Sequence, residues 1–380
     1  MRLLALFILL GSGMNLAAQT KPQKQKVYSF VKVRHTLEWY QEQLTLWEEE
    51  IKTNPKNADA WLNAYTAARM VKLSGGKKTN EDLKAIVDKA AIQIPGTFEY
   101  NYIVYYNAGI KNNSETNLQE AYRLGPDRPE LFDDFITMYE VNRDKVHLKE
   151  FCDKTFSANE ISEGLYNWNY NMLNSCDENG IILTVGDNDT YPALVLQHSQ
   201  GIRKDVLVLN ASLMCFIDEY CDKICIEIGI PEITFNEADD QKKRIQLLCV
   251  HIQKNSTRPF YYAATAPEEL YANVKDNVYT VGNAYKYSKE RFDNIAVLKR
   301  NVDQKFLKDY IKVTLQNDIS QSVVNDINYT YLVPFITLYR HYTNAGENER
   351  AENINSFIQV IAERSGITGE VDKMIKDCKK

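Results

Sequence analysis

The sequence lacks any apolar run that could cross a membrane as a helix. A bilayer span needs about 20 consecutive apolar residues, and the longest candidate, residues 3–10 near the N-terminus, is far shorter. We therefore expect no membrane span.

Concentrated positive charge is also missing. The chain has 45 Lys and Arg against 51 Asp and Glu, a formal net charge of -6. No basic run is longer than Lys77-Lys78 or residues 242–244. Because nucleic-acid binding needs a dense positive patch, we do not expect nucleic acid as a partner.

The common catalytic and cofactor motifs are absent. There is no GxSxG, no HExxH and no GxGxxG after an apolar run, and the five histidines are scattered. The segment SGGKKT, residues 74–79, is not a phosphate loop, because Val71 stands where the first glycine belongs and Lys78 where Ser or Thr is needed. We interpret it as a polar turn.

Cysteines are few and odd in number. Seven cannot all pair within one chain, and no CxxC or Cys/His spacing frames a metal site. Cys215, Cys221 and Cys225 are near enough in sequence for a local disulfide. The pattern otherwise favours buried thiols that pack as small apolar groups.

Among the features that the sequence does have, residues 1–18 show the pattern of a secretory signal peptide. Arg2 precedes an apolar core, and Ala17-Ala18 form a small-residue cleavage site. We predict a mature chain that starts at Gln19 and is exported to the periplasm as a soluble protein. No cysteine near that point offers a lipid attachment site.

Residues 19–175 predict tetratricopeptide-like helical repeats. Three segments read as helix, turn and helix, and Pro55, Pro95 and Pro126 mark the turns near the period of about 34 residues typical of this repeat. A fourth, partial unit is expected around residues 156–173. Stacked hairpins form concave surfaces that bind peptides, so we expect a protein partner here.

Residues 176–290 predict an α/β domain, and residues 291–380 a C-terminal helical region. Apolar runs at residues 181–185, 206–209, 259–263 and 278–281 alternate with helical patterns. This alternation is typical of a mostly parallel, Rossmann-like sheet covered on both faces. A last helical hairpin is expected over residues 329–366, with its turn at residues 344–346.

Polar residues follow the predicted strands, where loops of open parallel sheets line a ligand crevice. The ligand-binding candidates are Asp187, Asn188, Asp189, Thr190, Asn210 and Thr265. The oxygens of Asp187 and Asp189 could accept from sugar hydroxyls or bind Ca²⁺ or Mg²⁺. The alternative is structural: the loop braces its own turn and caps the next helix, with Arg203 or Lys204 as ion-pair partner.

The stretch GDNDTYPALVLQHSQGIRKDVLVLNASLM, followed later by RPFYYAATAPEELYANVKDNVYTVGNAYKY, resembles the soluble tail of a multispanning, Bacteroidetes-type family described as protein O-mannosyltransferase-like. The resemblance covers roughly residues 175–366 and implies the α/β fold of that tail, its GDNDT loop (residues 187–190 here match its DNDT) and an exported location. Glycosyl transfer in that family would belong to a membrane-embedded half to which no segment of this sequence corresponds.

These observations favour a binding protein over an enzyme, because no set of nucleophile, base and orienting residue is apparent. In the favoured hypothesis the repeats engage a protein partner and the α/β domain recognises a glycan or glycoconjugate. The alternative is a hydrolase or transferase of a sugar or phosphosugar that uses Asp187 and Asp189, with or without a divalent metal. A purely structural assembly factor is the third hypothesis.

Overall fold

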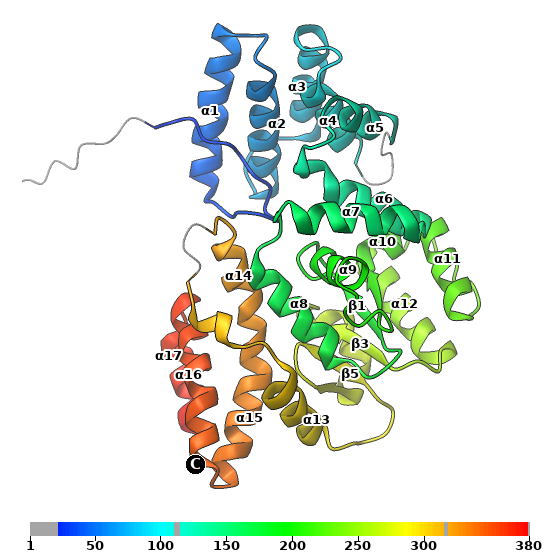
Figure 1. The fold of residues 1–380 in the computed structure, drawn as a ribbon, viewed down its shortest axis with the longest axis vertical. Helices are drawn as coiled ribbons and strands as arrows, with labels where there is room; N and C mark the ends of the chain where they lie inside the picture. Colours follow the sequence, from blue (N-terminus) through cyan, green and yellow to red (C-terminus); the bar gives the residue numbers. More distant parts are fainter. Residues whose placement is uncertain (1–21, 110–114, 315–317, 379–380) are drawn as a thin grey trace, which may run out of the picture.

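The computed structural model describes residues 22–109, 115–314 and 318–378. In Figure 1 the N-terminal helices lie at the top and the sheet lies below them. The last helices lie at the lower left. The predicted signal peptide, residues 1–18, lies outside the described residues.

The N-terminal region is a series of helical pairs, as the repeat pattern predicts. Its helices are α1 (Leu37–Thr53), α2 (Ala58–Leu73), α3 (Asn80–Gln93), α4 (Phe98–Ala108), α5 (Glu115–Leu124), α6 (Phe132–Asn142), α7 (Lys145–Ser157) and α8 (Glu163–Ser175). Pro55 lies in the connection between α1 and α2, Pro95 in that between α3 and α4, and Pro126 in that between α5 and α6. The Thr36 and Thr97 hydroxyls accept hydrogen bonds from first-turn amides, which fixes where their helices begin.

The sheet is mixed, so the prediction of a mostly parallel sheet is wrong. Its strands are β1 (Ile181–Thr184), β2 (Leu207–Asn210), β3 (Phe260–Ala263), β4 (Val278–Thr280) and β5 (Ala284–Tyr287), in the order β2-β1-β3-β5-β4. Strand β1 is parallel to β2 and β3, whereas β5 is antiparallel to β3 and β4. Residues 281–283, which join β4 to β5, are too few for a parallel crossover.

Helices cover both faces of the sheet. Ile182 and Val208 share a core with α9 (Tyr191–His198), whereas Ile181 and Leu183 pack on the other face. That second face is covered by α10 (Ala211–Phe216), α11 (Asp218–Ile228) and α12 (Gln241–Asn255). Neighbouring strand residues point to opposite faces, which is why the first three residues of β1, Ile181, Ile182 and Leu183, are all apolar.

The C-terminal region is helical, as predicted. It contains α13 (Asn294–Arg300), α14 (Gln321–Asn328), α15 (Leu332–Asn344), α16 (Asn348–Arg364) and α17 (Thr368–Cys378). The predicted hairpin corresponds to α15 and α16, with Gly346 at φ +74° in its turn.

Shorter helical turns occur between residues 129 and 331. They are η1 (Pro129–Leu131), η2 (Glu268–Leu270), η3 (Ala272–Asn277), η4 (Asn301–Lys305), η5 (Asp309–Lys312) and η6 (Tyr329–Tyr331).

Helix α8 joins the three regions. The Trp168 indole donates to the Thr330 hydroxyl over 3.0 Å, and the Asn171 amide donates to the Leu307 carbonyl over 2.8 Å. The Ser175 hydroxyl accepts from the Asn283 amide over 3.0 Å. One apolar core continues from the later repeats past α8 into the sheet and the last helices.

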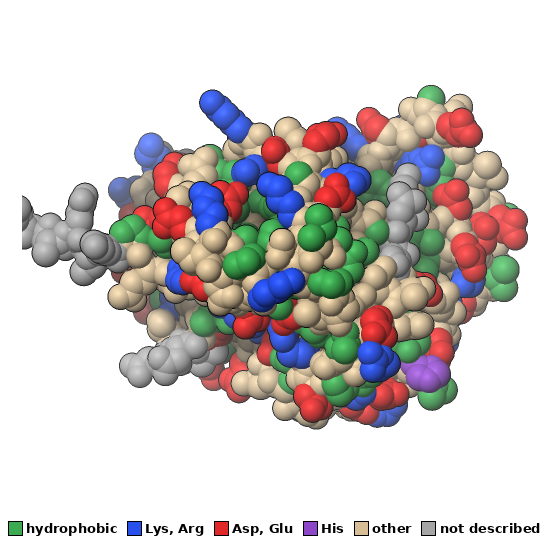
Figure 2. All heavy atoms as spheres, turned by 90° about the horizontal axis from the view of Figure 1, so that it is seen from above, with side chains coloured by type: hydrophobic (Ala, Val, Ile, Leu, Met, Phe, Trp, Pro, Cys, Tyr) green, Lys and Arg blue, Asp and Glu red, His purple; other side chains and the backbone are tan. Residues whose placement is uncertain are grey.

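No helix in the described part of the chain is both long and apolar enough to cross a bilayer. Figure 2, seen from the repeat end, shows acidic and basic side chains interspersed, with hydrophobic side chains gathered near the middle of that face.

Candidate functional site

The two aspartates of the GDNDT loop have different environments. Asp189 is 2% exposed, and its carboxylate accepts hydrogen bonds from the Val185 and Gly186 amides over 3.0 and 2.8 Å and from the Thr265 hydroxyl. Burial raises the pKa of Asp189, and these hydrogen bonds oppose the rise. Asp189 therefore holds the loop in shape.

Thr190 and Asn210 belong to the same buried network. The Thr190 hydroxyl donates to the Gly186 carbonyl over 2.6 Å and accepts from the Asn210 amide over 3.1 Å. The Asn210 side chain also accepts from the Leu213 amide and so caps α10. Thr190 occupies the cap position of α9, but its hydroxyl makes no capping hydrogen bond. The fold thus brings Asp189, Thr190, Asn210 and Thr265 together.

Arg203 is not the partner of the acidic loop. Its guanidinium donates to both carboxylate oxygens of Asp205 over 2.9 and 2.8 Å, and to the carbonyls of Leu173, Cys176 and Asp177 near the end of α8. Arg203 precedes β2, so it lies at the amino end of the parallel strands, whereas the loop follows β1 at the carboxyl end. A four-residue strand separates these ends by about 13 Å.

Asp187 is left at the surface. Its side chain is exposed, and it makes no hydrogen bond or ion pair with another described residue. The Asn188 carbonyl accepts a hydrogen bond from the Asn169 side-chain amide over 2.8 Å, which holds the loop against α8. Protein nevertheless surrounds Asp187 closely enough that desolvation, and then the Asp189 charge, raises its pKa.

Asp187 lies near the Asp133 carboxyl group of α6, and Asp133 in turn lies near Asp134. We call Asp133, Asp134 and Asp187, with Arg69 of α2, the acidic junction. Burial raises the pKa of Asp133 to about 7, and the Asp187 charge adds to this rise. Burial and then the Asp133 charge raise the pKa of Asp134 to about 8, against the opposing effects of Tyr hydroxyls and Arg69. Repulsion between neighbouring carboxylates favours the protonated forms.

Tyrosines and the Arg69 guanidinium complete the junction. The Tyr102 hydroxyl lies 3.1 Å from an Asp134 carboxyl oxygen, and the Tyr191 hydroxyl lies 2.6 Å from that of Thr137. Arg69 lies over the Tyr106 ring, 4.9 Å from its centroid, and makes no ion pair within the described residues. The junction can therefore both donate and accept hydrogen bonds.

Sequence reasoning missed the α2 and α6 residues, since they precede the loop by more than fifty positions and only folding brings them to it. The available indication was the Asp133-Asp134 pair in the first turn of α6.

No group of three or more His, Cys, Asp or Glu among the described residues is arranged to hold a metal ion. Asp189 points inward to backbone amides, so it does not join Asp187 in a shared coordination set.

The fold and the loop thus define a helical-repeat protein with a small α/β domain. Residues 165–231 match the family model described as TMEM260-associated domain 2. This segment contains nearly all of α8, then β1, the GDNDT loop, α9, β2, α10 and α11. No match to a curated protein was found.

Proposed function

We propose that this chain is an exported binding protein in which the acidic junction recognises a glycan or glycoconjugate and the helical repeats engage a protein partner. The observation that carries the proposal is that the two aspartates of the loop have different hydrogen-bonding environments. Asp189 accepts hydrogen bonds from the loop's own backbone, whereas Asp187 is unpaired at the surface near Asp133 and Arg69.

The chemistry of the junction suits a polyhydroxyl ligand. Sugar hydroxyls both donate and accept, and carboxyl groups with pKa values of about 7 and 8 exist in both forms near neutral pH. The Arg69 guanidinium donates only, and tyrosine hydroxyls do both. A phosphate would meet several carboxyl groups and one guanidinium, so a neutral glycan is the better fit.

The resemblance seen in the sequence is our reason for this choice of ligand class. The match to a TMEM260-associated domain covers the loop and its α8 support, and the GDNDT stretch resembles the soluble tail of the Bacteroidetes-type, mannosyltransferase-like family. Because transfer in that family would belong to a membrane-embedded half, we assign recognition rather than transfer to this chain. O-mannosylated peptides are therefore the first probes to use.

The test is binding of residues 19–380 to an array of neutral glycans and mannosylated peptides. We expect Asp187→Asn to weaken binding by about tenfold or more, since a charged acceptor is lost at an exposed position. Asp276→Asn, at an exposed aspartate far along the chain, is the matched control and should bind as the parent does. No binding by the parent, or equal binding by both variants, contradicts the proposal.

One observation favours a second function. A carboxyl group with a pKa of about 7, Asp133, lies near the carboxylate of Asp187, and such a pair could act as general acid and base on a glycosidic bond. Product release from the same mannosylated peptides, abolished by Asp133→Asn and by Asp187→Asn, would establish catalysis. Binding without product over long incubation would establish recognition.

A further inference from the structure

A separate pocket opens at the carboxyl ends of the three parallel strands. Its volume is about 340 Å³, within the lower range of small-molecule sites. Val185 follows β1, Ser212 follows β2, and the loop after β3 supplies Glu269 and Leu270. The chain leaves β1 towards α9 on one face and leaves β2 towards α10 on the other, and this divergence is where open α/β sheets bind ligands.

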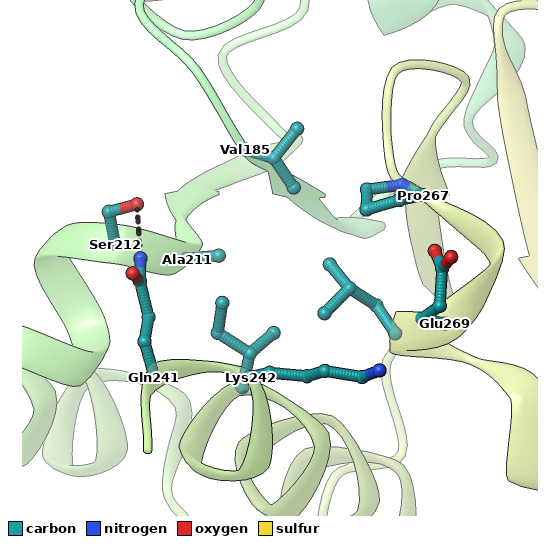
Figure 3. A pocket seen from close by; sticks show the side chains of 9 residues that line it. Val185, Ala211, Ser212, Gln241, Lys242, Pro267 and Glu269 are labelled. Atoms are coloured by element: carbon teal, nitrogen blue, oxygen red, sulfur yellow. Dashed lines mark hydrogen bonds between the residues drawn. The ribbon is translucent and has the colours of Figure 1, made fainter. Parts of the chain in front are cut away.

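The floor of the pocket is apolar and its mouth is charged. Val185, Ile245 and Leu270 supply apolar lining. Lys242 of α12 and Glu269 of η2 lie on one side of the opening (Figure 3). On the opposite side the Gln241 amide donates to the Ser212 hydroxyl over 3.1 Å. Lys242 and Glu269 are exposed, and no ion pair joins them in the described structure.

We infer that this pocket binds a small zwitterion with an apolar side chain, of the class of free aliphatic α-amino acids and short aliphatic peptides. The Lys242 ammonium pairs with the ligand carboxylate, the Glu269 carboxylate pairs with the ligand ammonium, and the aliphatic group lies on Val185, Ile245 and Leu270. A simple fatty anion would meet the Glu269 charge, and a simple amine would meet the Lys242 charge. Only a ligand with both charges satisfies both groups.

The pocket is independent of the acidic junction. None of the residues that line it belongs to that junction. Binding here therefore neither requires nor predicts glycan recognition.

The probes are L-leucine and L-leucyl-L-leucine, measured by calorimetry on residues 19–380. The comparison compounds are 4-methylpentanoate, which lacks the ammonium of leucine, and 3-methylbutylamine, which lacks its carboxylate. We expect at least one of the two zwitterions to bind and each comparison compound to bind at least about tenfold more weakly. The inference is overturned if either comparison compound binds as tightly as the zwitterions. It is also overturned if neither zwitterion binds.

Two variants at exposed positions complete the test. Lys242→Met and Glu269→Gln should each weaken binding of the zwitterion by about tenfold, and Lys254→Met, near the other end of α12, should leave it unchanged. Asp187→Asn should also leave it unchanged, which separates this site from the glycan proposal. Retained affinity in both pocket variants would show that the charges at the mouth do not select the ligand.

Discussion

Asp187 and Asp189 are separated by one residue, yet the fold gives them different roles. The turn after β1 directs Asp189 back to the Val185 and Gly186 amides and directs Asp187 outward to α6. The acidic residues and their position after a strand could be predicted from the sequence. Which carboxylate serves the turn could not, because that choice depends on the path of three residues and on Thr265, which is distant in sequence.

The first prediction at this scale concerns stability. Asp189→Asn should lower the free energy of unfolding by about 1–3 kcal/mol, because an amide has one acceptor oxygen and leaves buried donors without a partner. Asp187→Asn should change it by less than about 0.5 kcal/mol, as is usual for an exposed side chain. Urea unfolding of the two variants beside the parent measures both values, and equal loss in the two would contradict the division of roles.

The cysteines give a second prediction. Cys152, Cys176, Cys215, Cys221, Cys225 and Cys249 are buried and unpaired, so the expected buried thiols are confirmed for these positions. Burial raises the pKa values of Cys215 and Cys249 to about 12. Because the thiolate is the reactive form, a thiol reagent at pH 8 should label these positions slowly in the folded protein and rapidly in urea. Mass mapping of fast labelling at Cys215 or Cys249 in the folded protein would count against this.

At the scale of elements, the helices were more predictable than the strands. Helical period and turn prolines extend over many residues, so the repeat pairs and the α15–α16 hairpin follow from local pattern. The direction of a strand is not a local property. The apolar run of β4 reads as a parallel strand, and β5 contains Lys286 and forms no apolar run. The short β4–β5 connection alone indicates antiparallel pairing.

That connection yields the third prediction. Gly282 has φ +139°, and an added Cβ would lie 2.5 Å from the Ser175 hydroxyl oxygen and 2.6 Å from a Phe306 ring carbon. Gly282→Ala should therefore lower stability by about 1–3 kcal/mol, through both backbone strain and overpacking. Gly369→Ala in α17, where nothing lies within 4 Å, is the matched control and should be neutral or slightly stabilising. Thermal unfolding distinguishes the two, and a stable Gly282→Ala would show that α8 can move away from the hairpin.

At the scale of the whole molecule, the regions are connected through α8. The order of repeats, sheet and final helices could be predicted from changes in periodicity along the chain. The acidic junction could not, because its residues come from α2, α6 and the loop after β1. The sequence shows that these residues are present, but not that they lie close together in space. Helix α8 supports the loop through the hydrogen bond of Asn169 and contacts the later helices through Trp168.

The last prediction follows from that proximity. The pKa values of Asp133 and Asp134 are raised from 3.8 to about 7 and about 8 in the folded protein, so the folded state binds protons more tightly than the unfolded state. Their contribution to stability is therefore fully present below pH 4 and is lost as the pH rises through 7 and 8. His198 changes the pH dependence of stability in the opposite direction, because burial lowers its pKa from 6.5 to about 4.

The Asp133→Asn/Asp134→Asn variant retains His198, so comparing it with the parent isolates the effect of the two aspartates. We expect the melting temperature of the parent, relative to this variant, to fall between pH 5 and pH 8.5. A constant difference across that range would show that the two carboxyl groups titrate as they do in the unfolded chain and that the junction does not hold protons.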